Sequence, residues 1–86
     1  MFRAKLDRVA IVVKDAEKAV KDMEKLLGCE FYGPLDDKGA GLLVALPRRG
    51  GIELVSPTRS DDAINATGLL ATRGEGITGI ALRVDD

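Results

Sequence analysis

The order of apolar and polar positions predicts a strand followed by an amphipathic helix. Residues Leu6 to Val13 are rich in β-branched side chains, and one of their two alternating faces is wholly apolar while the other begins with Arg8. Residues 1–5 are expected to be frayed, so this strand is the first element of the fold. From Asp15 to Leu27 the apolar side chains recur every three or four residues, the spacing of one helical stripe. Asp15 suits the N-cap, and Gly28 suits a left-handed C-terminal cap.

Three further short strands are expected after this helix. Cys29 to Tyr32 is the first of them, ended by Gly33-Pro34, and a polar loop over residues 36–41 follows. Leu42 to Leu46 and Ile52 to Val55 flank a turn of sequence PRRGG, which predicts an antiparallel hairpin. Glu53 is a carboxylate inside this apolar hairpin, on the same face as Val55.

The last part of the chain repeats its beginning. Residues 78–86 (TGIALRVDD) align with residues 7–15 (DRVAIVVKD), so the repeated phrase marks the first strand of each of two modules. Between the two copies, Ser60 to Arg73 is expected to form a weak helix, and a Gly-rich turn leads into a strand from Ile77 to Val84. We therefore divide the chain into a first module (1–59), a linking helix and turn (60–76) and an opening strand (77–86).

Composition narrows the chemistry. The 86 residues carry a net charge of −1, one cysteine and no histidine. A near-neutral chain does not suit phosphate-neutralising nucleic-acid binding, and no apolar run is long enough for a membrane span. The single Cys29 allows no intrachain disulfide and fits a reducing, cytoplasmic setting. Without histidine, His-based catalytic triads are excluded, and the commonest zinc ligand is missing.

Three blocks of sequence carry a resemblance to a known family. They are LDRVAIVVKDAEKAVKDMEKLLGCEF, IELVSP and RGEGITGIALRVDD, in that order. Together they resemble the vicinal oxygen chelate superfamily of glyoxalase I, bleomycin-resistance proteins and extradiol dioxygenases, and most of all its methylmalonyl-CoA epimerase-like members. The resemblance implies an α+β fold: a βαβββ module, a linking helix and the first strand of a second module.

The family's usual metal site carries over poorly. The resemblance implies a divalent metal held by a His on the first strand and a Glu on the fourth strand of each of two modules. The first His falls on Arg8, the first Glu on Glu53 and the second His on Gly79, while the last Glu would lie beyond Asp86. One ligand of the four, Glu53, is thus present, and it is also the one residue to which a catalytic role could be given. We predict no metal ligand set and no cofactor.

Two interpretations of Arg8 and Glu53 follow. If both lie on the cavity face, as the resemblance implies, a guanidinium–carboxylate pair replaces the metal. On the first interpretation, this pair only neutralises a buried charge. The other interpretation is that Arg8, Glu53 and Arg83 bind an anionic ligand.

We therefore expect a metal-free module that binds a small anionic molecule. The alternatives are a divalent-metal-dependent epimerase, lyase or dioxygenase of the same superfamily, and a structural dimerisation module. A single module leaves an apolar face carrying Val12, Val44, Val55 and Ala81 uncovered. This predicts a homodimer, with exchange of the last strand as one form of it. A fragment of a longer protein is the other explanation of the uncovered face.

Overall fold

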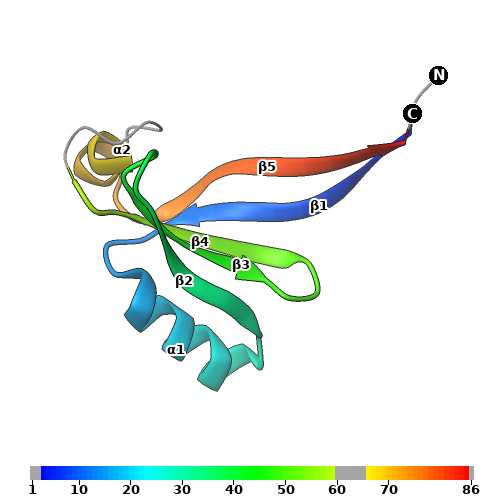
Figure 1. The fold of residues 1–86 in the computed structure, drawn as a ribbon, viewed down its shortest axis with the longest axis horizontal. Helices are drawn as coiled ribbons and strands as arrows, with labels where there is room; N and C mark the ends of the chain where they lie inside the picture. The colour runs from blue at the N-terminus through cyan, green and yellow to red at the C-terminus, as the bar shows by residue number, and fades with distance from the viewer. Residues whose placement is uncertain (1–2, 60–65, 86) are drawn as a thin grey trace.

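The chain folds into one five-stranded sheet with a helix on each side (Figure 1). The computed structural model describes residues 3–59 and 66–85. In chain order the elements are β1 (Arg3–Val12), α1 (Ala16–Leu27), β2 (Phe31–Asp37), β3 (Leu42–Pro47), β4 (Gly51–Pro57), α2 (Ala66–Arg73) and β5 (Gly76–Asp85). The strand order across the sheet is β2-β3-β4-β1-β5.

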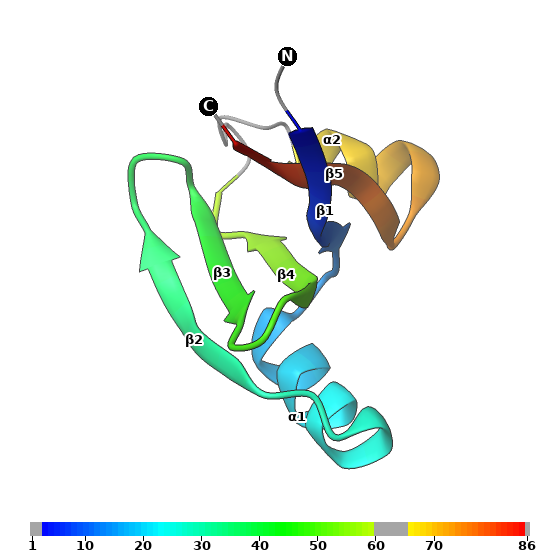
Figure 2. The same ribbon diagram turned by 90° about the vertical axis from the view of Figure 1, so that its right-hand side faces the viewer.

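β1 lies between β4 of the first module and the returning strand β5. It pairs in parallel with β4 and antiparallel with β5, while β3 pairs antiparallel with both β2 and β4. This confirms the α+β class, the βαβββ module and the extra strand that repeats the first. β1 and β5 extend together beyond the other strands as a two-stranded arm (Figure 1), which points toward the viewer in Figure 2.

The helix α1 covers one face of the sheet. As predicted, the Asp15 carboxylate accepts a hydrogen bond from the backbone N–H of Lys18, 3.1 Å away, and Gly28 ends the helix in the left-handed region. The apolar stripe of α1 packs on inward-facing strand residues as far as Met23, whereas Leu26 and Leu27, which the periodicity placed on the same stripe, are exposed in the last turn. The buried members of this core are Val13, Ala16, Val20, Phe31, Ala45 and Leu54.

The helix α2 covers part of the opposite face, which corrects one expectation. Val12 and Val55 were predicted to be uncovered, yet they are 1% and 2% exposed because they pack with Ala66, Leu69 and other residues. The prediction treated 60–73 as a linker and did not place it on the sheet. Residues 60–65 of the predicted helix lie outside the described residues.

All five strands are longer than the pattern predicted, and β1 and β2 also differ in where they begin: residues 3–5 belong to β1 and not to a frayed start, and β2 begins at Phe31 and not at Cys29. β1 begins at Arg3 because the antiparallel ladder with β5 continues to the pair of Arg3 with Asp85. β2 does not end at Gly33-Pro34 and takes in the first two residues of the predicted loop, ending at Asp37. A register shift between Tyr32 and Leu35 accommodates the glycine and proline, and pairing with β3 resumes at Leu35.

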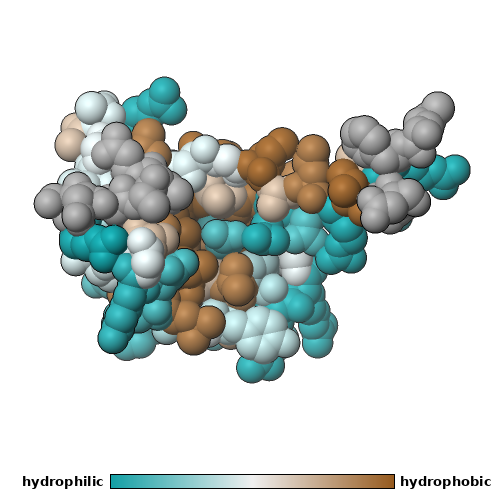
Figure 3. All heavy atoms as spheres, turned by 45° about the horizontal axis from the view of Figure 1, so that its top comes forward, coloured by the Kyte–Doolittle hydropathy of each residue, from teal (hydrophilic) through white to brown (hydrophobic). Residues whose placement is uncertain are grey.

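No helix among the described residues is long and apolar enough to cross a membrane. Exposed large apolar side chains lie on α1 and β2 and also on the arm, where Figure 3 shows a run of hydrophobic atoms. Those of the arm are Leu6, Ile77, Ile80, Leu82 and Val84.

The irregular β2 yields a test of the fold. Gly33 has φ +96°, and a Cβ there would lie 2.6 Å from the Leu35 backbone nitrogen and 2.8 Å from the Val44 carbonyl oxygen. Gly33→Ala should therefore lower the free energy of unfolding by about 1–3 kcal/mol, measured by urea denaturation. Gly39→Ala is the control, since the nearest atom to a Cβ at that position would be Asp37 Oδ1 at 3.7 Å, an ordinary contact. Equal effects of the two substitutions would contradict the β2 geometry.

Candidate functional site

The centre of the candidate site is a contact between β1 and β4. In their parallel register Ala10 lies opposite Glu53, so Arg8, two residues before Ala10, shares the face of Glu53. The Arg8 Nε donates a hydrogen bond to Glu53 Oε1. The structure thus brings together the two residues that the resemblance placed on one cavity face.

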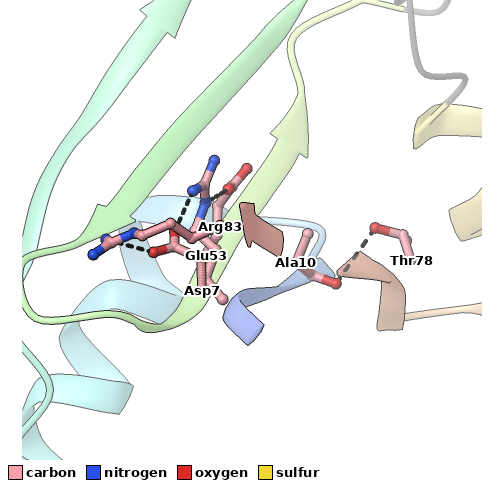
Figure 4. A network of polar contacts seen from close by, with 6 residues as sticks. Asp7, Ala10, Glu53, Thr78 and Arg83 are labelled. Carbon is pink, nitrogen blue, oxygen red and sulfur yellow. Dashed lines mark hydrogen bonds and ion pairs between the residues drawn. The ribbon is translucent and has the colours of Figure 1, made fainter. Parts of the chain in front are cut away.

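Asp7 joins this contact through an irregularity in β1. The β1–β5 register shifts between Leu6 and Arg8, which leaves Asp7 without a partner in the ladder. Arg8 Nη1 donates to Asp7 Oδ2 at 2.7 Å, and Arg83 Nη2 donates to Asp7 Oδ1 at 2.8 Å. Consecutive residues of a regular strand face opposite ways, but a bulge can re-aim a side chain. Figure 4 shows Asp7, Glu53 and Arg83 gathered at this point.

The four side chains form a charge-balanced network. Hydrogen bonds to Glu53 and then to Asp7 raise the pKa of Arg8 above its ordinary value. The hydrogen bond from Arg8 is the largest cause of a lowered pKa of Asp7; burial opposes it, and the charge and hydrogen bond of Arg83 lower the pKa further. The side chains of Asp7 and Glu53 are 21% and 16% exposed, whereas Arg83 is 75% exposed and its ion pair is screened by water.

An open groove of about 440 Å³ lies beside this network. Arg8 and Arg83 line it, and Glu53 does not, although it holds Arg8 in place. The lining consists of Asp7, Arg8, Tyr32, Leu46, Pro47, Arg48, Arg49, Gly50 and Arg83. Gly50 has φ +80°, and a Cβ there would lie 3.2 Å from the Asp7 carbonyl oxygen, so the hairpin turn sits against the bulge of β1.

Two arginines of this groove were not predicted as site residues. Arg48 and Arg49 belong to the sequence PRRGG, which we interpreted as a turn alone. The Arg48 guanidinium lies 4.9 Å from the centroid of the Tyr32 ring, a cation–π contact between the turn and β2. The sequence offered one signal for them, the two adjacent arginines in a turn. That they share a groove with Tyr32 depends on the pairing of β2 with β3, which the sequence pattern does not show.

The residues of this site do not fit a divalent metal. Among residues 3–59 and 66–85, no three or more His, Cys, Asp or Glu side chains lie close enough together to hold a metal ion. Glu53, the one family ligand in this chain, hydrogen-bonds to a guanidinium. The metal-free state itself stays a prediction, since a donor can come from outside these residues.

The network makes stability depend on pH in a defined direction. The pKa of Asp7 lies below its ordinary value of 3.8 in the folded chain, so its ion pairs stabilise the fold above that value. Stabilisation is lost as the pH falls through the folded-state pKa. The difference in free energy of unfolding between wild type and Asp7→Asn should therefore shrink between pH 6 and about pH 3. Asp22→Asn, on the exposed face of α1, is the control. A constant difference for Asp7→Asn would rule out the ion pairs as its source.

Solved structures support the resemblance. The chain is 28% identical to methylmalonyl-CoA epimerase from Mycobacterium tuberculosis, with a TM-score of 0.81, covering 94% of this chain and 55% of that one. A hypothetical protein from Bacillus halodurans is 27% identical with a TM-score of 0.79, covering 92% of this chain and 57% of that one. Methylmalonyl-CoA epimerase from Streptomyces coelicolor, in complex with 2-nitronate-propionyl-CoA, is 24% identical with a TM-score of 0.76, covering 91% and 60%.

The chain therefore spans little more than half the length of these structures. A comparison with curated proteins gives no match. A family model, described as the Glyoxalase/Bleomycin resistance protein/Dioxygenase superfamily, matches residues 7–86. With nearly the whole chain matched and the βαβββ module in place, this protein belongs to the glyoxalase/bleomycin resistance protein/dioxygenase superfamily.

Proposed function

We propose that this chain binds a small anionic organic molecule in the arginine-lined groove, without a divalent metal. The observation that carries the proposal is the Arg8–Glu53 contact, because a guanidinium neutralises the one carboxylate that the family would use for a metal. The groove beside it combines four arginines with the apolar side chains of Leu46 and Pro47. Such a mixture suits an anion that carries an apolar part.

Coenzyme A thioesters are the first class of ligand to test. The epimerase from Mycobacterium tuberculosis is named for methylmalonyl-CoA, and a thioester of this kind carries several phosphate charges. The sequence identity of 28% supports this as a choice of probe for the present chain. The activity of a whole protein of that family remains a proposal here, since the chain spans about half of such a structure.

Metal-dependent epimerisation is the second candidate. The family membership favours it, because such a reaction would use a metal to polarise the substrate oxygens and a carboxylate such as Glu53 to move a proton. The described residues do not provide the ligand set that this chemistry requires. Metal-dependent epimerisation is therefore the less favoured of the two candidates.

Titration calorimetry with methylmalonyl-CoA separates the two candidates. We expect the chain to bind methylmalonyl-CoA with equal affinity in the presence and absence of EDTA, and elemental analysis to find no stoichiometric metal. Epimerisation that depends on added Co²⁺ or Ni²⁺ and is lost in Glu53→Gln would reverse this assignment. Absence of binding by a well-folded dimer would instead favour a structural dimerisation module.

We also propose that a second copy of the chain covers β5. This strand is an edge of the described sheet, and its exposed Ile80, Leu82 and Val84 side chains form an apolar strip. Unpaired edges and apolar strips of this kind favour association. In this structure β5 pairs with β1 of its own chain, and a strand-exchanged dimer would form the same pairing between chains.

Light scattering after size-exclusion chromatography tests the dimer. We expect wild type to elute as a dimer and Leu82→Lys as a folded monomer, because Leu82 is 55% exposed and its replacement need not disturb the monomer core. Leu26→Lys is the control, since Leu26 is 77% exposed on α1, away from β5. A wild-type monomer would show that β5 requires a different partner, such as further residues of a longer chain.

A further inference from the structure

The charges around the groove do not balance once the ion pairs are assigned. Arg8 and Arg83 contact Asp7 and Glu53, so these two cations and two carboxylates sum to zero. Arg48 and Arg49 remain on the same groove. The positive charge that attracts an anion therefore lies at the hairpin turn between β3 and β4, and not at the residues singled out from the sequence.

The pairing of the two turn arginines is weak. Within the described part of the chain, Arg48 has no carboxylate within ion-pair distance, and its guanidinium lies over Tyr32. Arg49 Nη2 is 3.9 Å from Glu30 Oε1, and the Arg49 side chain is 86% exposed. An ion pair this long and this exposed contributes little. Both guanidinium groups thus keep donors for a ligand.

The turn that carries these arginines is anchored at both ends. The Arg48 backbone N–H donates to the Glu30 carbonyl oxygen at 2.9 Å, which ties the turn to the residue before β2. Gly50 brings the other end of the turn against the backbone of Asp7. Because the backbone is held in this way, a ligand need order only the two arginine side chains.

We infer that Arg48 and Arg49 form a subsite for a phosphate group of the ligand, and that Arg8 and Arg83 shape the floor beside it. This inference rests on the proposed anion-binding function. Two guanidinium groups match the double charge of a phosphate monoester better than the single charge of a carboxylate, and each can bind phosphate oxygens in a bidentate way. Leu46 and Pro47 lie in the same groove for the uncharged part of the ligand.

A pair of probes tests this assignment. Methylmalonyl-CoA carries phosphate groups, whereas the methylmalonyl thioester of pantetheine lacks them. We expect wild type to bind the coenzyme A ester roughly tenfold or more tighter than the pantetheine ester, as charge-assisted contacts to phosphate would give. In Arg48→Gln/Arg49→Gln this preference should disappear, because the coenzyme A ester should lose more affinity than the pantetheine ester.

The matched control is Lys21→Gln/Lys25→Gln, which removes the same number of positive charges from the exposed face of α1. We expect it to keep the wild-type preference. If wild type binds both esters equally, or if the preference survives in Arg48→Gln/Arg49→Gln and is lost in Arg83→Gln, the subsite is wrong while the proposed function stands. If wild type binds neither ester, the proposed function for this ligand class fails and the subsite fails with it.

Discussion

The site depends on how a half-buried carboxylate is neutralised. Glu53 lies on β4 between the apolar residues Ile52 and Leu54, and its side chain is 16% exposed. A charge in such a place needs a cation and hydrogen-bond donors. In this chain the cation is the Arg8 guanidinium on the neighbouring strand β1. Its Nε donates to Glu53, and its Nη1 donates to Asp7. Removing either partner would leave the other charge poorly compensated.

An internal cation changes what the groove can recognise. A bound divalent metal would leave coordination positions for ligand oxygens, but Arg8 already directs donors toward Glu53 and Asp7. An anion at this position would have to compete with two carboxylates. We therefore propose recognition of negative charge at Arg48 and Arg49. Among the described residues, Glu30 is the one carboxylate within ion-pair distance of either, at 3.9 Å from Arg49, and it is exposed. The anion binding that we propose thus requires no metal ligands from the described residues.

The sequence predicted the layout better than the chemistry. Periodicity and caps placed α1 between Asp15 and Gly28, and the internal repeat identified β5 as a copy of β1. The contact of Arg8 with Glu53 followed from the resemblance together with strand alternation. Asp7 was missed because alternation assigns it to the opposite face, and a bulge is a property of two paired strands. The packing of α2 over Val12 and Val55 was missed because it joins residues far apart in the chain.

Association of identical chains cannot restore the family's metal site. A two-fold dimer adds a second Glu53 and a second Asp7, but it adds a second Arg8 and a second Arg83 with them, so the local charge balance is unchanged. No histidine is present in the sequence, and the position where the resemblance places the second His is Gly79, opposite Ala10 on β1. Nitrogen donors would have to come from residues outside these 86, whichever way β5 is covered. A metal bound by this chain alone, or by two copies of it, would therefore have to rely on oxygen ligands, and any such ion would compete with Arg8 for Glu53.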